Sequence, residues 1–132
     1  MGGAPSSSAG MATLDLSSRY DGLLYAHGSD APFSFKGANW FGSESYNGPP
    51  GGLHKHSIGH YLDFLASHDF NSIRLLFNHE QVLRNDIIET TTEELEHEPQ
   101  LFQLRYIEMF HHLAREAAQR GIVLMLACHR IK

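Results

Sequence analysis

Three short apolar stretches of the sequence each lead into side chains that could do chemistry. Asn39 and Trp40 end the first stretch, Arg74 lies within the second, and His129 follows the third. A tryptophan ring stacks on the C–H face of a sugar ring, while Arg, Asn and His side chains hydrogen-bond to hydroxyl groups or orient a carboxylate. These residue types suit a carbohydrate ligand if the fold brings the three stretches together.

The three apolar stretches predict three buried strands, near Phe35–Asn39, Ile73–Phe77 and Ile122–Ala127. The second and third are almost continuously apolar, a pattern typical of parallel strands that are covered on both faces. A hairpin is predicted before the first strand. There, residues 22–25 and 33–35 flank the polar turn His27-Gly28-Ser29-Asp30.

Two helices are predicted between these strands. Ser57 suits the N-cap of a helix that ends near His68. An apolar stripe over residues 101–118 predicts the second helix, with Pro99 in its first turn and Gly121 at its end. The connection over residues 78–98 is long and acidic in its second half, and the small, polar residues 1–13 are expected to be disordered.

The predicted order is therefore hairpin, strand, helix, strand, helix, strand. Alternating strands and helices predict a parallel sheet with right-handed crossovers. A doubly wound sheet and a (β/α)₈ barrel begin in the same way, so the order alone leaves both open. In a barrel, the active site is assembled where the strands end.

The residues around these strand ends resemble one family. The segment Phe35–Glu44, which reads Phe-Lys-Gly-Ala-Asn-Trp-Phe-Gly-Ser-Glu, resembles the first strand of family 5 glycoside hydrolases with its Lys-Gly-x-Asn-Trp-Phe-Gly signature. Asn71–Phe77 resembles the second strand, an Ile-Arg-Leu-x-Phe run, and Gly121–Arg130 is similar to the third, which ends in x-His-Arg. The resemblance covers about residues 14–132, with the three motifs in order.

The resemblance implies a fold. It predicts the N-terminal part of a TIM barrel, truncated after its third strand, in which the hairpin plugs the barrel floor. Residues 14–132 would then be a partial catalytic domain behind a disordered segment at residues 1–13.

The resemblance also implies an activity, the retaining hydrolysis of a β-glucan such as cellulose. The family uses two Glu residues, forms a covalent glycosyl-enzyme intermediate and needs no cofactor or metal. Its acid/base Glu follows the fourth strand in an Asn-Glu pair and its nucleophile follows the seventh, so we expect no catalytic residue in this chain and no activity of the chain alone. The chain departs from the family at Ala127, where the third strand usually carries Asp.

Three residues are expected to bind substrate. By the resemblance, Arg74 would stabilise the ionised nucleophile, and His129 and Trp40 would contact the sugar near the bond that is cleaved. Each has a plainer alternative: a salt bridge between Arg74 and a helix residue, a histidine that only ends a strand, and a tryptophan that only packs.

Two further groups of polar residues have plainer readings too. His54, His56 and His60 could bind zinc if a loop and a helix start brought them together, but a solvated histidine-rich loop is the default and no metal is expected. The acidic run over residues 92–98 is expected to be a solvated face.

Bulk composition narrows the function classes. The formal charge is −5 and no Lys/Arg cluster occurs, which argues against nucleic acid and anionic membranes as partners. No stretch approaches the roughly 18 apolar residues of a membrane span. The first residues lack the features of a signal peptide, so localisation stays open, although the resemblance suggests an extracellular enzyme. Two alternatives also stay open: a non-catalytic carbohydrate-binding remnant of the barrel, and an α/β module unrelated to sugars.

Overall fold

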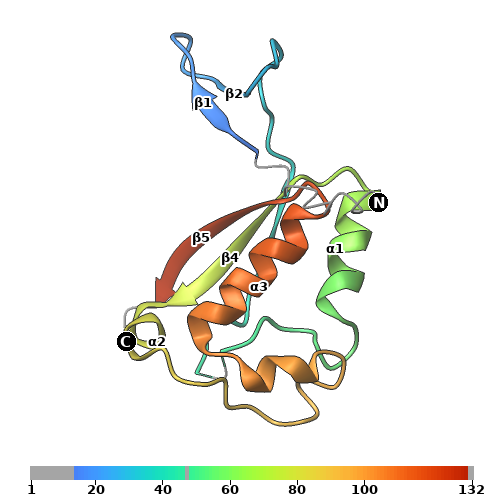
Figure 1. The fold of residues 1–132 in the computed structure, drawn as a ribbon, viewed down its shortest axis with the longest axis vertical. Coiled ribbons are helices and arrows are strands. Elements are labelled where there is room, and N and C mark those ends of the chain that lie inside the picture. The colour runs from blue at the N-terminus through green and yellow to red at the C-terminus, as the bar shows by residue number, and fades with distance from the viewer. Residues whose placement is uncertain (1–13, 47, 131–132) are drawn as a thin grey trace, which may run out of the picture. The chain divides into compact units, whose positions relative to one another are not determined.

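The computed structural model describes residues 14–46 and 48–130, except for the side chain of Arg130. The predicted disorder of residues 1–13 lies outside the described residues. The chain divides into two compact units, one that ends at Ser34 and one that begins at Phe35 (Figure 1).

The first unit is a hairpin with a different strand pairing from the predicted one. Strand β1 (Leu16–Ser18) pairs antiparallel with β2 (Leu24–Ala26). The predicted pairing of residues 22–25 with 33–35 is found only in part, because no strand forms at 33–35. Beyond the turn at His27 there is an isolated antiparallel bridge between Tyr25 and Pro32 and one hydrogen bond from the Phe33 N–H to the Leu24 carbonyl. Pro32 has no N–H to donate, so it does not extend a ladder.

The second unit contains a three-stranded parallel sheet, as predicted. Its strands are β3 (Gly37–Trp40), β4 (Ser72–Asn78) and β5 (Val123–Arg130), in the order β3-β4-β5. The register places Asn39 beside Arg74 and Arg74 beside Met125. The described residues form an open α/β layer and no closed barrel.

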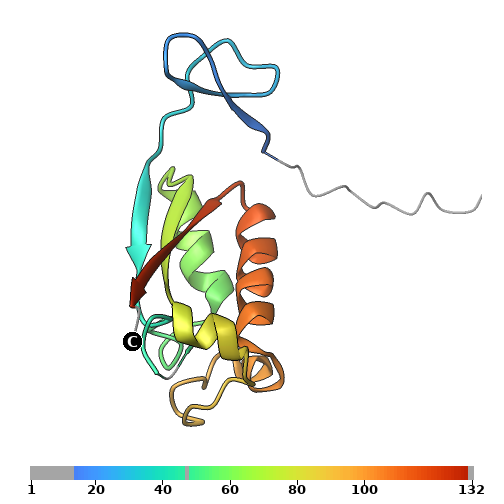
Figure 2. The ribbon, with the colours of Figure 1, turned by 90° about the vertical axis from the view of Figure 1, so that its left-hand side faces the viewer.

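Helices α1 (Ile58–Ser67) and α3 (Tyr106–Ala118) cover the same face of this sheet (Figure 2). The Ser57 side chain caps α1 as predicted, since its hydroxyl accepts a hydrogen bond from the His60 N–H at 3.1 Å. Gly121 follows α3 with a φ of +70°, a left-handed conformation that glycine adopts without strain. The core lies between the sheet and the helices and includes Ile73, Leu75, Ile58, Leu62, Met109, Leu113 and Ala117.

The second predicted helix is split in two. A 3₁₀ helix, η1 (Pro99–Gln103), precedes α3, and Leu104 between them is extended, with φ −101° and ψ 147°. The Leu104 carbonyl accepts a hydrogen bond from the Ile88 N–H, which ties the long connection to this break. Leu101 is still fully buried, so the apolar stripe packs as expected although two elements carry it.

The long connection contains structure that was not predicted. A short helix, α2 (His79–Arg84), begins directly after β4 and is capped by Asn78. The acidic run is not a solvated face throughout, because Leu95 and Glu98 are buried. A Glu98 carboxylate oxygen accepts a hydrogen bond from the Ile58 N–H at 2.6 Å. The carboxylate therefore satisfies a donor at the start of α1, where an anion is favoured.

Candidate functional site

Arg74 projects from the face of the sheet that carries no helix. Successive side chains of a strand alternate between faces, and Ile73 and Leu75 both belong to the core under the helices. Arg74 must therefore point the other way, and its register partner Asn39 lies on the same face, because Ala38 is the partner of Ile73. The structure thus places a guanidinium and an amide side by side on the helix-free face.

Arg74 is half-buried and makes no ion pair with any described residue. The structure therefore shows no salt bridge between Arg74 and a described helix residue, which was the alternative role considered for it. Its guanidinium presents five donors in a fixed fork, which matches a carboxylate or a pair of hydroxyl groups. The side chain is available for such a partner.

Trp40 lies on the opposite face from Arg74. Its register partner is Leu75, and its indole packs against the core below the helices. The indole N–H donates to the Gly51 carbonyl at 2.8 Å, and the ring meets that of Tyr61 edge-on at 5.5 Å. Trp40 also borders a largely apolar hollow of about 790 Å³ together with Phe64. This placement favours the packing alternative for Trp40 over a shared site with Arg74.

His129 lies at the carboxyl end of β5, as expected. Phe77 is paired with Cys128 and Asn78 with Arg130, so His129 is an extra residue opposite a shift in register. A bulge at a strand end changes the direction of a side chain and is common beside active sites. The imidazole is exposed, and its contact with a sugar stays a prediction.

The loop after β3 is fixed to the end of β4. The Tyr106 hydroxyl, at the start of α3, donates to the Ser43 carbonyl and accepts from the Asn78 N–H at 3.1 Å. The Asn78 amide donates to the Glu44 carbonyl at 3.3 Å, and that of Gln81 donates to the Ser45 carbonyl. The carboxyl edge of the sheet therefore has a rim with defined geometry.

Burial raises the pKa of Tyr106 to about 12, so the phenol stays protonated at neutral pH and keeps its donor role. The sequence analysis missed Tyr106. No sequence motif marks a tyrosine at the start of a helix. Its role follows from its hydrogen bond to the Ser43 carbonyl, which is far away in the sequence.

The histidines near α1 gather into a cluster that also includes His97. The rings of His56 and His60 stack at 4.1 Å, and His97 lies 6.5 Å from His56. Desolvation, together with His60, His97 and Lys55, lowers the pKa of His56. No three or more His, Cys, Asp or Glu side chains in residues 14–46 and 48–130 are arranged to hold a metal ion.

Comparison with known proteins identifies the kind of fold that carries this site. No family model matches the chain. An endoglucanase of Paenibacillus polymyxa is 32% identical over 97 residues, which are 74% of this chain and 24% of that protein. The structure of the hyperthermophilic endocellulase of Pyrococcus horikoshii superposes with a TM-score of 0.74 at 29% identity. The chain is a relative of the cellulases.

Other structures agree with this relationship. A complex of the Pyrococcus endocellulase with cellotetraose superposes with a TM-score of 0.72 at 30% identity and covers 88% of this chain. The catalytic domain of the major endoglucanase of Xanthomonas campestris, at 24% identity and a TM-score of 0.67, shows the same fold. The resemblance to cellulases inferred from the motifs is thus confirmed.

This cellulase-related chain is much shorter than the proteins it matches. It spans 24% of the Paenibacillus endoglucanase and 31% of the Pyrococcus endocellulase. None of its described helices is long and apolar enough to cross a membrane.

Proposed function

We propose that this chain forms the N-terminal part of the catalytic domain of a family 5 glycoside hydrolase, a TIM barrel that hydrolyses β-glucans such as cellulose. One observation carries the proposal. Arg74, in the strand that resembles the family's second strand, lies beside Asn39 on the helix-free face and has no carboxylate partner among the described residues. In a barrel with helices outside, that face is the interior.

The proposed role of Arg74 is to position the nucleophile of the complete enzyme. A guanidinium beside a carboxylate favours the ionised form and lowers its pKa. A retaining glycosidase needs an ionised nucleophile while its partner carboxyl is protonated, with the two carboxyl groups about 5 Å apart. Both carboxylates would come from strands that this chain does not contain, and no metal or cofactor is needed.

Asn39 and His129 are proposed to hydrogen-bond sugar hydroxyls near the cleaved bond. Both residues are exposed. Asn39 lies on β3 and His129 on β5, the two strands that border the strand of Arg74. Amide and imidazole groups both form hydrogen bonds with hydroxyl groups. Trp40 would support the wall of the site from behind, through its contacts with Gly51 and Tyr61.

The proposal predicts that the 132-residue chain hydrolyses no glycan by itself. Without an acid/base and a nucleophile the barrier for glycoside cleavage stays essentially uncatalysed. Assays on carboxymethyl-cellulose and on an aryl β-cellobioside should show no turnover. Turnover that is lost on changing Arg74 or His129 would contradict the proposal.

A hybrid enzyme tests the positive half of the proposal. Residues 35–130 would replace the matching segment of the Paenibacillus endoglucanase, which supplies the remaining strands. The hybrid should hydrolyse carboxymethyl-cellulose. A folded hybrid that binds cello-oligosaccharides but never cleaves them would favour the alternative, a non-catalytic carbohydrate-binding remnant.

A further inference from the structure

The paired part of β3 and β4 ends before β4 does. The last paired residue of β3 is Trp40, and β4 continues three residues beyond the partner of Trp40, to Asn78. If the same register continued, Ser43 would lie opposite Asn78. Instead, the Phe41 carbonyl accepts a hydrogen bond from the Gly51 N–H at 2.9 Å. The chain therefore turns away from β4 directly after β3.

A buried phenol lies between the two segments that separate here. Tyr106, the first residue of α3, is 3% exposed. Its hydroxyl donates to the Ser43 carbonyl and accepts from the Asn78 N–H at 3.1 Å. A direct backbone hydrogen bond places N and O about 2.9 Å apart, whereas a hydroxyl group between them allows up to about twice that distance. The Tyr106 hydroxyl therefore joins the two segments and also keeps them apart.

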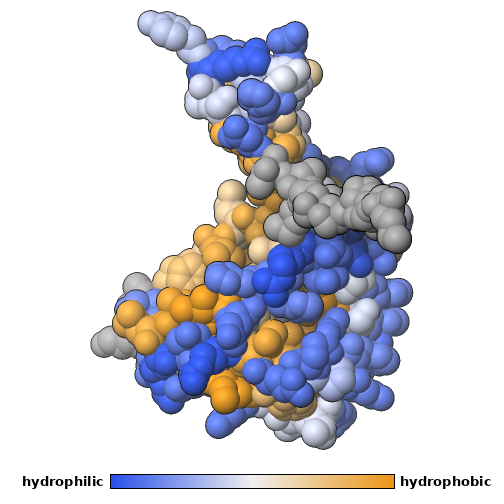
Figure 3. All heavy atoms as spheres, in the orientation of Figure 1, coloured by the Kyte–Doolittle hydropathy of each residue, from blue (hydrophilic) through white to orange (hydrophobic). Residues whose placement is uncertain are grey.

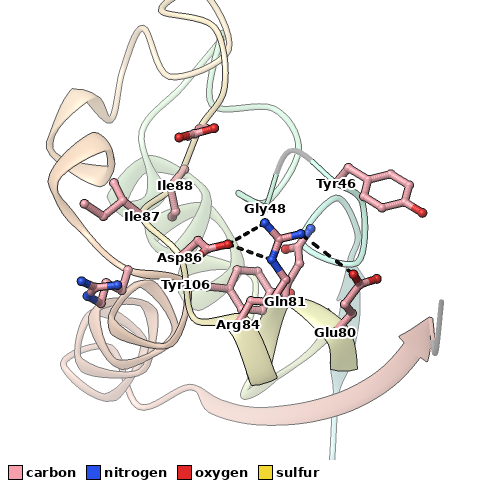
Figure 4. A pocket seen from close by; sticks show the side chains of 11 residues that line it. Tyr46, Gly48, Glu80, Gln81, Arg84, Asp86, Ile87, Ile88 and Tyr106 are labelled. Carbon is pink, nitrogen blue, oxygen red and sulfur yellow. Dashed lines mark hydrogen bonds and ion pairs between the residues drawn. The ribbon is translucent and has the colours of Figure 1, made fainter.

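The Tyr106 ring has a fixed position. It meets the Phe110 ring edge-on at a centroid distance of 4.9 Å. Figure 4 shows the ring beside Gln81 of α2, and a Cβ added to Gly48, in the loop after β3, would lie 3.6 Å from it. Burial raises the pKa of the phenol to about 12, so it donates and accepts a hydrogen bond at the same time at neutral pH.

The two strands separate next to residues of the proposed active site. Asn39 and Arg74 are register partners, one residue before the last pair of β3 and β4. Both lie on the helix-free face, so the separation begins at the carboxyl edge just beyond them. If residues 41–43 paired with residues 76–78, the backbones would lie only about 4.8 Å apart there. The extra width is available to a ligand that contacts both side chains.

We propose that Tyr106 is a positioning residue of the proposed active site, whose hydroxyl keeps β3 and β4 apart at the carboxyl edge so that one sugar ring contacts both Asn39 and Arg74. The inference rests on the proposed function. Because Tyr106 is buried, it acts through the two strands and not through contact with the substrate. Without the hydroxyl, the Ser43 carbonyl and the Asn78 N–H lose their shared partner, and the two segments can approach each other.

Turnover of the hybrid enzyme tests this role. Tyr106→Phe removes only the hydroxyl and should lower kcat on carboxymethyl-cellulose about 10- to 100-fold, because a displacement of about 1 Å in an active site can cost 100-fold. The matched control is Glu98→Ala, which also deprives one backbone N–H of its acceptor, but at Ile58 in α1. This control should leave kcat unchanged.

A loss of stability alone would affect both variants alike. In an active hybrid, equal kcat values for Tyr106→Phe and Glu98→Ala would therefore overturn the inference and leave the proposed function standing. A folded parent hybrid without turnover would instead count against the proposed function.

Hydrogen exchange in the full 132-residue chain, labelled with ¹⁵N, tests the geometry without the hybrid. The Asn78 amide should be protected in the parent chain and should exchange about 10-fold faster in Tyr106→Phe, the effect of losing one buried hydrogen bond. The Ile58 amide should exchange at the same rate in both. Equal protection of Asn78 in both chains would overturn the inference. Fast exchange of Asn78 in the parent chain would do so even if Tyr106→Phe does not fold.

Discussion

Asn78, the last residue of β4, links this strand to helix α2 and to the loop after β3. Its side-chain oxygen accepts from the Glu80 N–H at 2.9 Å, its amide donates to Glu44, and the residue is 1% exposed. Among the described residues, the other buried polar side chains are those of Ser43, Ser72 and Glu98. The rim of the proposed site depends on it.

Replacing Asn78 by Ala should therefore destabilise the chain by about 1–3 kcal/mol, because the N-cap of α2 is lost and the partly buried N–H groups of Glu80 and Gln81 lose their acceptor. Urea denaturation followed by circular dichroism would measure this. Asn39→Ala is the matched control, since Asn39 is exposed and should change stability by less than about 0.5 kcal/mol. Equal effects of the two substitutions would contradict the structural role given to Asn78.

The histidine cluster makes a prediction about pH. The pKa of His56 is lowered in the folded chain by desolvation and by His60, His97 and Lys55, so the unfolded chain binds a proton more readily. Stability from this group is present above its unfolded pKa and is lost as pH falls through the folded value. The denaturation midpoint should therefore rise between about pH 5 and pH 7.5, the range of histidine titration.

His56→Gln should flatten that pH dependence. His54→Gln, at a histidine outside the ring contacts of His56 with His60 and His97, is the matched control. Urea midpoints measured at several pH values decide this. An unchanged slope in His56→Gln would show that the cluster does not control the stability of this region.

At the scale of elements, a buried carboxylate joins the end of the acidic connection to the start of α1. Glu98 is buried and accepts the Ile58 N–H at the start of α1. Glu98→Ala leaves that donor unsatisfied and should cost about 1–3 kcal/mol. The exposed Glu96→Ala should cost little. Hydrogen exchange should show faster exchange of the Ile58 amide in the first variant only; protection unchanged in Glu98→Ala would refute the contact.

The sequence predicted those elements whose periodicity is strong. The strands around Ile73 and Val123 and the helix after Ser57 combine apolar periodicity with clear end signals, and their positions were confirmed. Helix α2 was missed because six residues do not display a helical period. Strand β1, Leu-Ser-Ser, has too little apolar character to predict pairing.

The break at Leu104 was hidden by the sequence pattern itself. Leu101, Leu104 and Ile107 keep helical spacing. The extended conformation at Leu104 accompanies a long-range hydrogen bond from the Ile88 N–H to the Leu104 carbonyl, which the spacing does not reveal. For the site, the alternation of β3 was visible in advance: Asn39 and Trp40 are adjacent and must face opposite sides. The sequence does not show which of the two faces the helices. The structure shows that it is Trp40, which packs against the core under them.

At the scale of the whole molecule, the second unit is a sheet with open borders. Strands β3 and β5 form the two edges of the described sheet. In β5, Met125 is 54% exposed and Leu126 is 53% exposed. Figure 3 shows apolar side chains gathered along this strand. Unpaired strand edges with apolar side chains favour pairing with other chains.

The isolated chain is therefore expected to self-associate and to melt without strong cooperativity. Met125→Lys together with Leu126→Lys should reduce association, because charges on an edge strand oppose pairing. Sedimentation or light scattering of both proteins would measure it, with Tyr20→Lys, at an exposed residue of the hairpin unit, as the control. A parent chain that is monomeric with a cooperative melt would contradict this account.

The most direct test of the central claim is the turnover of the hybrid enzyme on carboxymethyl-cellulose, with and without Arg74. Arg74→Ala in the hybrid should lower kcat about 100-fold or more with little change in KM, the loss typical when one preorganised charged or donor group is removed from an active site. Arg115→Ala, at an exposed arginine on α3, should leave kcat unchanged. A folded, active hybrid in which Arg74→Ala and Arg115→Ala turn over equally fast would contradict the account.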